Sequence, residues 1–222
     1  KRFQRLSSDC HFAAGWREDQ KAAKTYLMMM PKECGAALNV KFSFVCPSST
    51  PRTKGTVEAP WPPLGVLYCA GMLINNGVEV SVFDQAARMA SSEQVLNWVR
   101  KEDPDILGFS VLITSLRESL DFARQAKEIN PDLLTVFGNY HATFNAERIL
   151  KAYPWVDLIV RGEGEYACLE IVKDLKAKSG LENVQGLTYR KKSHIVSAPD
   201  RPLIKDLDAL PFPKRDLLDV DY

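Results

Sequence analysis

The sequence predicts a flavodoxin-like (Rossmann-like), doubly wound α/β domain around a five-stranded parallel sheet. Two observations carry this prediction. Between residues 39 and 180, short apolar segments alternate five times with segments that have the spacing of amphipathic helices. The strand segments are mostly apolar, as expected for strands covered on both faces. Right-handed crossovers between such units give an open parallel sheet with helices on both sides.

The regular pattern begins at Asn39. Residues 1–38 form an N-terminal extension of unknown role, in which only residues 16–30 resemble a short helix. Residues 40–46 alternate and are rich in β-forming types, so they predict the first strand. Residues 47–63 form a long loop rich in Pro, Ser and Thr, and loops of this length are usually functional or disordered.

Strands and helices then follow in regular order. A helix is predicted over residues 64–77, because prolines fit its start and a glycine fits its end. The helix predicted from residue 91 begins with serine, a preferred N-cap. Further strands are predicted over residues 79–84, 105–110, 133–138 and 157–162, and further helices over residues 91–102, 115–129, 145–153 and 165–178.

Beyond Gly180 the rhythm changes. Residues 184–190 and 193–198 predict the two strands of a hairpin around a pair of lysines. The remainder is proline-rich and extended, like a linker into a further domain. We therefore divide the chain into an extension (1–38), an α/β domain (39–180) and a hairpin with linker (181–222).

The composition excludes several classes of function. The 222 residues are 45% hydrophobic and 26% charged, with a formal net charge of +1, so nothing indicates a nucleic-acid partner. No apolar run approaches the roughly 20 residues of a membrane span, and no signal peptide is recognisable. The five cysteines are scattered, which favours a cytoplasmic location over a disulfide framework.

Metal and cluster chemistry is not expected on this chain. No two cysteines stand only a few residues apart, as zinc and iron–sulfur ligands usually do. We therefore expect the purified chain to carry no iron–sulfur cluster. The cysteines are Cys10, Cys34, Cys46, Cys69 and Cys168, and the histidines are His11, His141 and His194.

Ligands of open α/β sheets bind beyond the carboxyl ends of the strands. Ser, Thr, Asn, His, Gly and Glu crowd those ends here. Each of these residues could instead have a purely structural role. Ser110 and Thr114 could cap the helix that follows them, and Asp84 could cap a turn. Gly138 could serve a tight turn, and His141 could be an ordinary loop histidine.

Several common signatures are missing from this edge. No G-x-G-x-x-G follows the first strand, and the chain contains no P-loop. A phosphoacceptor domain would need acidic residues after the first strand, where Cys46 and Pro47 stand, and a basic residue after the fifth strand. No Ser or Cys nucleophile has a plausible base beside it.

Five segments nevertheless form a recognisable combination. They are PPLGVLYCAGMLINNGVEVSVFD, PDILGFSVLITS, GNYHAT, VDLIVRGEGE and LPFPKRDLL, and the combination covers roughly residues 39–218. It resembles the cobalamin-binding domain of cobalamin-dependent radical S-adenosylmethionine enzymes. That family includes methyltransferases and the anaerobic oxidative cyclase of bacteriochlorophyll synthesis. VRGEGE with an upstream G-x-x-H-[AP]-T is fairly specific in combination, whereas each piece alone is weak.

The resemblance implies a place for each part of cobalamin. The corrin ring lies over the strand ends, and the nucleotide tail enters a groove between sheet and helix. Ser110 and Leu112 match the S-x-L turn that lines this groove, and Gly138 begins a Gly-Gly pair whose second residue is here Asn139. The candidate cofactor-binding residues are Pro63, Leu64, Gly65, Asp84, Gln85, Ala86, Ser110, Leu112, Thr114, Gly138, Asn139, Tyr140, His141, Ala142, Thr143, Gly162, Glu163, Gly164 and Glu165.

The corner at residues 160–165 is interpreted as part of this edge. Its glycines let backbone approach a bulky ligand, and its carboxylates can accept hydrogen bonds from ligand hydroxyls or amides. The alternative is a tight turn before a helix whose N-terminal dipole favours Glu165. A side chain at Gly164 is expected to meet a strained backbone or the cofactor. We therefore expect Gly164→Val to weaken cobalamin binding while the free domain stays folded.

Two departures from related proteins bear on the chemistry. The methionine-synthase type of cobalamin domain uses D-x-H-x-x-G, whose histidine ligates cobalt, but Ala86 occupies the histidine position here. The resemblance therefore implies cobalamin without a histidine ligand from this turn, with His141 as the other candidate. S-adenosylmethionine and a [4Fe-4S] cluster belong to a downstream radical domain, whose C-x-x-x-C-x-x-C motif this sequence lacks. The chain alone is therefore not expected to be catalytic.

Three hypotheses remain open at this point. The first is the cobalamin module of a radical S-adenosylmethionine methyltransferase or cyclase, with the radical domain in cis or in trans. The second is a free-standing, non-catalytic cobalamin carrier or sensor. The third is a flavodoxin-like domain that binds another ligand or none. A visible spectrum after reconstitution with hydroxocobalamin separates the third hypothesis from the other two.

Overall fold

A computed structural model describes residues 38–48 and 61–220. The expectations for residues 1–37 and for most of the long loop lie outside the described residues. The chain divides into two units, residues 1–36 and 37–222, and everything below concerns the second unit.

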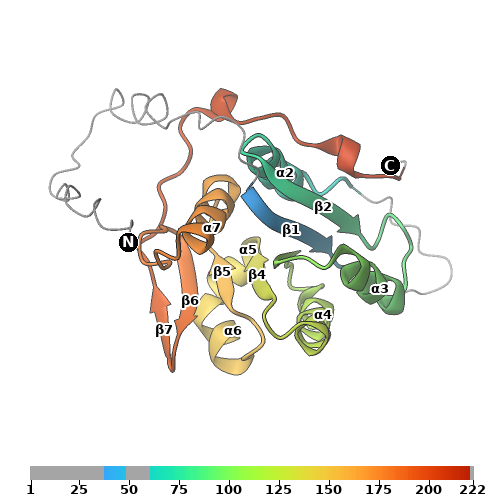
Figure 1. Cartoon of the computed structure of the whole chain (residues 1–222), viewed down its shortest axis with the longest axis horizontal. Coiled ribbons are helices and arrows are strands. Elements are labelled where there is room, and N and C mark those ends of the chain that lie inside the picture. Colours follow the sequence, from blue (N-terminus) through green and yellow to red (C-terminus); the bar gives the residue numbers. More distant parts are fainter. Residues whose placement is uncertain (1–37, 49–60, 221–222) are drawn as a thin grey trace, which may run out of the picture. The chain divides into compact units, whose positions relative to one another are not determined.

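The predicted alternation of strands and helices is confirmed (Figure 1). Each element predicted within residues 38–48 and 61–220 is present within a few residues of its expected bounds, and one short helix, α5, was expected to be a loop. The strands are β1 (Leu38–Cys46), β2 (Val78–Asp84), β3 (Ile106–Ser110), β4 (Leu134–Gly138), β5 (Leu158–Val160), β6 (Leu187–Lys191) and β7 (His194–Ser197). The α-helices are α2 (Leu64–Ile74), α3 (Ser92–Glu102), α4 (Leu116–Ile129), α5 (Tyr140–Phe144), α6 (Ala146–Ala152) and α7 (Glu165–Ala177), and two 3-10 turns are η1 (Leu207–Ala209) and η2 (Arg215–Leu217).

One sheet of seven strands in the order β2-β1-β3-β4-β5-β6-β7 runs through the domain. Strands β1 to β5 pair in parallel, as predicted. The predicted hairpin is present, and it continues the same sheet because β6 pairs antiparallel with β5. Strand β2 lies on one side of β1, and β3, β4 and β5 follow on the other side. The strand order therefore reverses between β1 and β3. In open α/β sheets the ligand crevice lies at this reversal.

Two apolar clusters fill the space on the two faces of the sheet. Helices α2 and α7 cover one face, and α3, α4 and α6 cover the other (Figure 1). On the first face the rings of Phe42 and Phe44 stack with centroids 4.4 Å apart. They fill the space beside Gly108, where an added Cβ would lie 2.7 Å from the Phe44 ring. A glycine at this point of β3 therefore permits the aromatic packing.

Local sequence signals explain several helix ends. The Ser91 side chain accepts a hydrogen bond from the Gln94 backbone (3.3 Å), and the Gln94 side chain accepts one from the Ser91 backbone (2.8 Å), which closes a capping box on α3. Gly77 follows α2 with φ +77°, a conformation that favours glycine. No helix within residues 61–220 is long and apolar enough to cross a membrane.

Candidate functional site

Hydrogen bonds tie together the turns that follow β3, β4 and β5. The Asn139 amide nitrogen donates to the Ser110 hydroxyl (3.0 Å). The Thr143 hydroxyl donates to the Asn139 carbonyl (3.0 Å) and accepts from the Gly162 backbone nitrogen (3.2 Å). The structure therefore joins four of the predicted site residues in one hydrogen-bond network at the carboxyl edge of the sheet. This network, called the relay below, consists of Ser110, Asn139, Thr143 and Gly162.

Asn139 is a strained residue within this relay. Its φ of 77° and ψ of 176° lie in a region that is essentially confined to glycine. Such a residue costs on the order of 1–3 kcal/mol, and strained residues cluster at functional sites. The Asn139 side chain compensates by accepting a hydrogen bond from the Tyr140 backbone (2.6 Å) while it donates to Ser110. These bonds explain how asparagine can stand where a second glycine was expected.

Three glycines of this edge face open space. A Cβ added at Gly65, Gly138 or Gly162 would have no non-neighbouring atom within 4 Å. The φ of Gly162 is +73°, so the turn itself requires glycine there. Gly65 and Gly138 lie in α2 and β4 without positive φ, where glycine costs about 0.5–1 kcal/mol relative to alanine. The cost is explained if a bulky group lies against the backbone.

Large apolar side chains are exposed around the same turns. Ile113 is 73% exposed, Tyr140 75% and Phe144 82%. Leu64 and Leu112 are each 43% exposed. Sequence reasoning identified Leu64, Leu112 and Tyr140 but missed Ile113 and Phe144, although an apolar residue inside a polar turn is a usable signal. Exposed apolar patches usually mark a binding surface.

The two glutamates of the 160–165 corner have different environments. The Glu163 carboxylate accepts a hydrogen bond from the Ile204 backbone nitrogen (2.6 Å), so it binds the C-terminal segment of the same chain. Glu165 begins α7, and its Oε2 atom is buried without a hydrogen-bond partner. Burial raises the pKa of Glu165, and the nearby charge of Glu163 adds to this effect. An unsatisfied buried acceptor of this kind can be satisfied by a donor on a ligand.

The surroundings of Gly164 differ from those expected from the sequence, which were a strained backbone or the cofactor. Its φ is −96°, so its backbone is not strained. An added Cβ would lie 3.1 Å from the sulfur of Cys69 and 3.9 Å from that of Cys168, inside the packing between α2 and α7. A side chain at Gly164 therefore meets the core, and the glycine with positive φ in this corner is Gly162.

The turn after β2 is held by its own side chains. The Asp84 carboxylate accepts from the backbone nitrogens of Ala86 (3.0 Å) and Ala87 (3.1 Å), so its plain structural interpretation is confirmed. Gln85 is buried, accepts from the Ser48 backbone (2.8 Å) and donates to Glu118 (2.8 Å). Asp84 and Gln85 therefore shape the turn, and of the three predicted residues here only Ala86 is exposed.

The segment after β4 forms helix α5 instead of the expected loop. Within it, Ala142 is fully buried, so its side chain packs in the core. His141 is half-buried beside it. The Asn139 cap was a usable signal for this helix, because asparagine is a preferred residue at helix starts.

The remaining predicted residues flank the helices of the edge. The Pro63 carbonyl accepts the hydrogen bond from Leu67 that begins α2. Thr114 is exposed, and the N-cap of α4 is Ser115, whose hydroxyl accepts from the Leu112 backbone (3.0 Å). The alternative that Ser110 or Thr114 caps α4 is therefore wrong.

The described cysteines are buried free thiols. They are Cys46, Cys69 and Cys168. A hydrogen bond with Cys168, together with burial, raises the pKa of Cys69 well above that of an ordinary thiol. Within residues 38–48 and 61–220, no three His, Cys, Asp or Glu side chains are grouped so that they could hold a metal ion.

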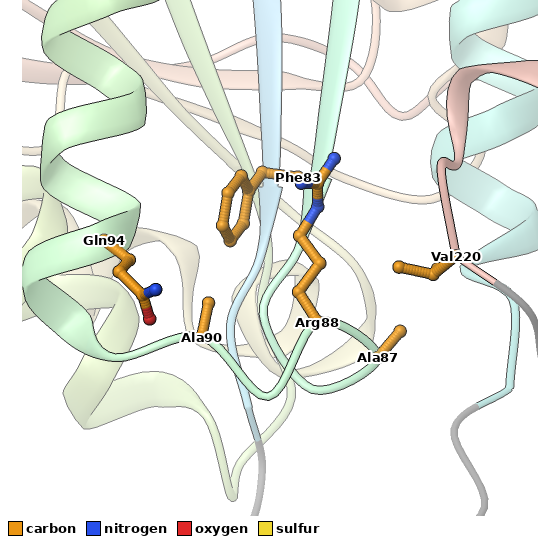
Figure 2. Close-up of a pocket in the computed structure, with 6 residues that line it drawn as sticks. All are labelled: Phe83, Ala87, Arg88, Ala90, Gln94 and Val220. Atoms are coloured by element: carbon orange, nitrogen blue, oxygen red, sulfur yellow. The ribbon is translucent and has the colours of Figure 1, made fainter.

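A pocket of about 380 Å³ lies at the end of β2 (Figure 2). The Arg88 guanidinium lies over the Phe83 ring, 4.5 Å from its centroid. Val220 from the C-terminal segment forms the opposite wall, so this pocket lies between the turn after β2 and the end of the described chain.

Comparison with known proteins agrees with this geometry. A family model described as the B12 binding domain matches residues 53–172. The uncharacterized methyltransferase PH0819 of Pyrococcus horikoshii is 32% identical over 182 residues, which are 82% of this chain and 39% of that protein. The anaerobic magnesium-protoporphyrin IX monomethyl ester cyclase of Rubrivivax gelatinosus is 35% identical over 159 residues, 69% of this chain and 29% of the cyclase. The chain thus spans less than half the length of these relatives.

A solved structure shares the fold. The cobalamin-dependent S-adenosylmethionine radical enzyme OxsB, with aqua-cobalamin bound, superposes with a TM-score of 0.68 at 21% identity, over 81% of this chain and 25% of OxsB. The family model covers more than half of the chain and includes the relay, the open glycines and the 160–165 corner. The chain therefore belongs to the family of B12-binding domains.

Proposed function

We propose that this chain holds cobalamin at the carboxyl edge of its sheet and serves as the cobalamin module of a larger radical S-adenosylmethionine enzyme of the methyltransferase or cyclase type. The observation that carries the proposal is the open backbone at Gly138, next to the relay that joins Ser110, Asn139 and Thr143. A strained, hydrogen-bonded turn that leaves space beside it is preorganised for a bulky ligand.

The residues at this edge fit the chemistry of cobalamin. The corrin ring is broad and largely apolar, and the exposed side chains of Leu112, Ile113 and Tyr140 offer matching apolar area. The amides and the ribose of cobalamin are hydrogen-bond donors, and the unpartnered Oε2 of Glu165 is an acceptor already removed from water. Bound cobalamin would supply the cobalt chemistry, while these residues bind it, orient it and exclude water.

The turn after β2 supports binding without a histidine from that turn. The position that corresponds to the histidine of D-x-H-x-x-G is Ala86, and the Asp84 carboxylate is engaged by the backbone of its own turn. A ligand to cobalt from the protein would have to come from elsewhere. His141, half-buried in α5, is the histidine nearest in sequence to the relay.

The larger enzyme is inferred from the relatives. Those described above are named a methyltransferase and a cyclase, and this chain spans 39% and 29% of their lengths. S-adenosylmethionine and a [4Fe-4S] cluster would then belong to a radical domain outside this sequence, in cis or in trans. The free-standing carrier or sensor is the alternative that a partner search would test.

Reconstitution tests the binding step. The chain is incubated anaerobically with hydroxocobalamin, passed through a desalting column and examined by visible spectroscopy. We expect about one corrinoid per chain to elute with the protein. Elution of all corrinoid in the small-molecule fraction, from a chain with the circular dichroism of a folded α/β domain, would contradict the proposal.

A further inference from the structure

The C-terminal residues 199–220 form a strap that crosses the domain instead of leaving it directly. Figure 1 shows this segment passing α7 and α2 and ending on the side of β2. Near α7, Arg201 forms an ion pair with Glu170. The next fixed point is the hydrogen bond that the Ile204 backbone donates to Glu163 (2.6 Å). The start of the strap is therefore fastened both to α7 and to the corner after β5.

The middle of the strap lies directly on α2. The Lys214 backbone donates to the Leu67 carbonyl (3.2 Å). A Cβ added at Gly71 would lie 2.9 Å from the Phe212 carbonyl oxygen and 3.3 Å from the Pro211 side chain. Gly71 therefore permits this close approach, and the strap is packed on the domain along this stretch.

The far end of the strap is fastened to the turn after β2. Asp219 forms an ion pair with Arg88, and Val220 and Ala87 both line the pocket described above (Figure 2). The stem of Arg88 is itself held because its guanidinium lies over Phe83. Met89, in the same turn, has φ 48° and is 80% exposed.

Two of these contacts, at Glu163 and at Arg88, lie in loops of the cofactor edge, and we propose that the strap responds to cobalamin. Glu163 belongs to the corner after β5, and Arg88 to the turn after β2. This inference rests on the proposed function. A cofactor that contacts both loops favours the loop geometry in which they hold the strap, so occupancy stabilises the fastened strap. By linkage, a fastened strap must favour cofactor binding by the same factor.

The consequence concerns the chain that follows residue 222 in a longer protein. A fastened strap fixes the point and direction at which that chain leaves the domain. Occupied and empty forms would therefore present the following segment differently. Glu163 acts here as a positioning residue for the strap, and Arg88 does the same at the other end.

Hydrogen–deuterium exchange of the full 222-residue chain tests this inference. Peptides covering residues 203–220 are followed by mass spectrometry with and without saturating hydroxocobalamin, and the dissociation constant is measured in parallel. The test variant is Asp219→Asn. Its matched control is Asp216→Asn, the same change three residues earlier at an exposed acid without an ion pair among the described residues.

We expect hydroxocobalamin to slow exchange of the strap at least about threefold in the parent and in Asp216→Asn. Asp219→Asn should lose most of this protection and bind hydroxocobalamin about two- to fourfold more weakly, the range set by one partly exposed ion pair. Normal binding with unchanged strap exchange would overturn the inference and leave the proposed function intact. Equal affinities for both variants would also overturn it. Absence of binding by the folded parent would remove the proposed function itself.

Discussion

Substitution of Gly164 by valine separates a core role from a ligand role at the 160–165 corner. The added Cβ would begin 3.1 Å from the sulfur of Cys69, which is tighter than ordinary van der Waals contact, and two further methyl groups must be placed beyond it. Cys69 and Cys168 are buried, so neither neighbour can move into solvent. Overpacking of this kind costs about 1–3 kcal/mol. At about 2–4 °C per kcal/mol for a domain of this size, Gly164→Val should lower the melting temperature by roughly 2–12 °C.

The assay is thermal unfolding of the cobalamin-free chain by circular dichroism. Gly138→Val is the matched control, because it adds the same side chain at a glycine with open space and without positive φ. Its melting temperature should stay close to that of the parent. Cys69→Ala should reduce the penalty of a milder Gly164→Ala change, with a coupling energy of at least about 0.5 kcal/mol between the two sites.

Two results would refute this reasoning. If Gly164→Val melts like the parent but binds hydroxocobalamin at least tenfold more weakly, the side chain at this position meets the cofactor. The interpretation of Gly164 from the sequence alone would then be correct. Additive effects of Cys69→Ala and Gly164→Ala would equally show that the two residues do not compete for space.

Three further predictions concern the cofactor and its surroundings. Electron paramagnetic resonance of the cob(II)alamin form should show no nitrogen splitting from an axial histidine, and His141→Ala should leave the spectrum unchanged; a splitting that His141→Ala removes would identify His141 as the ligand. Anaerobic reconstitution with iron and sulfide should leave no stoichiometric cluster, since the cysteines lack cluster spacing. Glu165→Gln should raise the melting temperature of the cobalamin-free chain at pH 7. Burial raises the pKa of Glu165, so its stabilising contribution is complete below the ordinary glutamate value of about 4.3 and is lost as pH rises through the folded pKa. The increase in melting temperature caused by Glu165→Gln should therefore disappear near pH 4. An equal increase at pH 7 and at pH 4 would contradict this prediction.

Much of the fold could be predicted because its signals are local. The strands are short apolar runs bounded by turn residues, and Ser91 marks the start of α3 through contacts within one turn. The hairpin of β6 and β7 was also visible, but its addition to the edge of the main sheet was not. That pairing joins Val160 to Leu187, 27 positions along the chain, and no local pattern specifies it.

From the sequence, the site could be placed only at the carboxyl ends of the strands. The relay from Ser110 to Gly162 follows from topology, because the carboxyl ends of neighbouring parallel strands meet at one edge. The direction of each side chain does not follow from topology. Gly164 faces Cys69, and Glu163 binds the Ile204 backbone 41 residues later, through tertiary contacts that the motif GEGE does not encode.

The account depends most directly on cobalamin lying against the backbone at Gly138. A titration of the parent, Gly138→Val and Ala152→Val with hydroxocobalamin, followed by visible spectroscopy, measures this. Ala152 is exposed at the end of α6, so Ala152→Val adds a similar side chain outside the relay. We predict one site per parent chain, unchanged affinity for Ala152→Val, and at least tenfold weaker binding for a folded Gly138→Val, or about 1.4 kcal/mol. Equal affinity of all three proteins would contradict the placement of the cofactor at this edge.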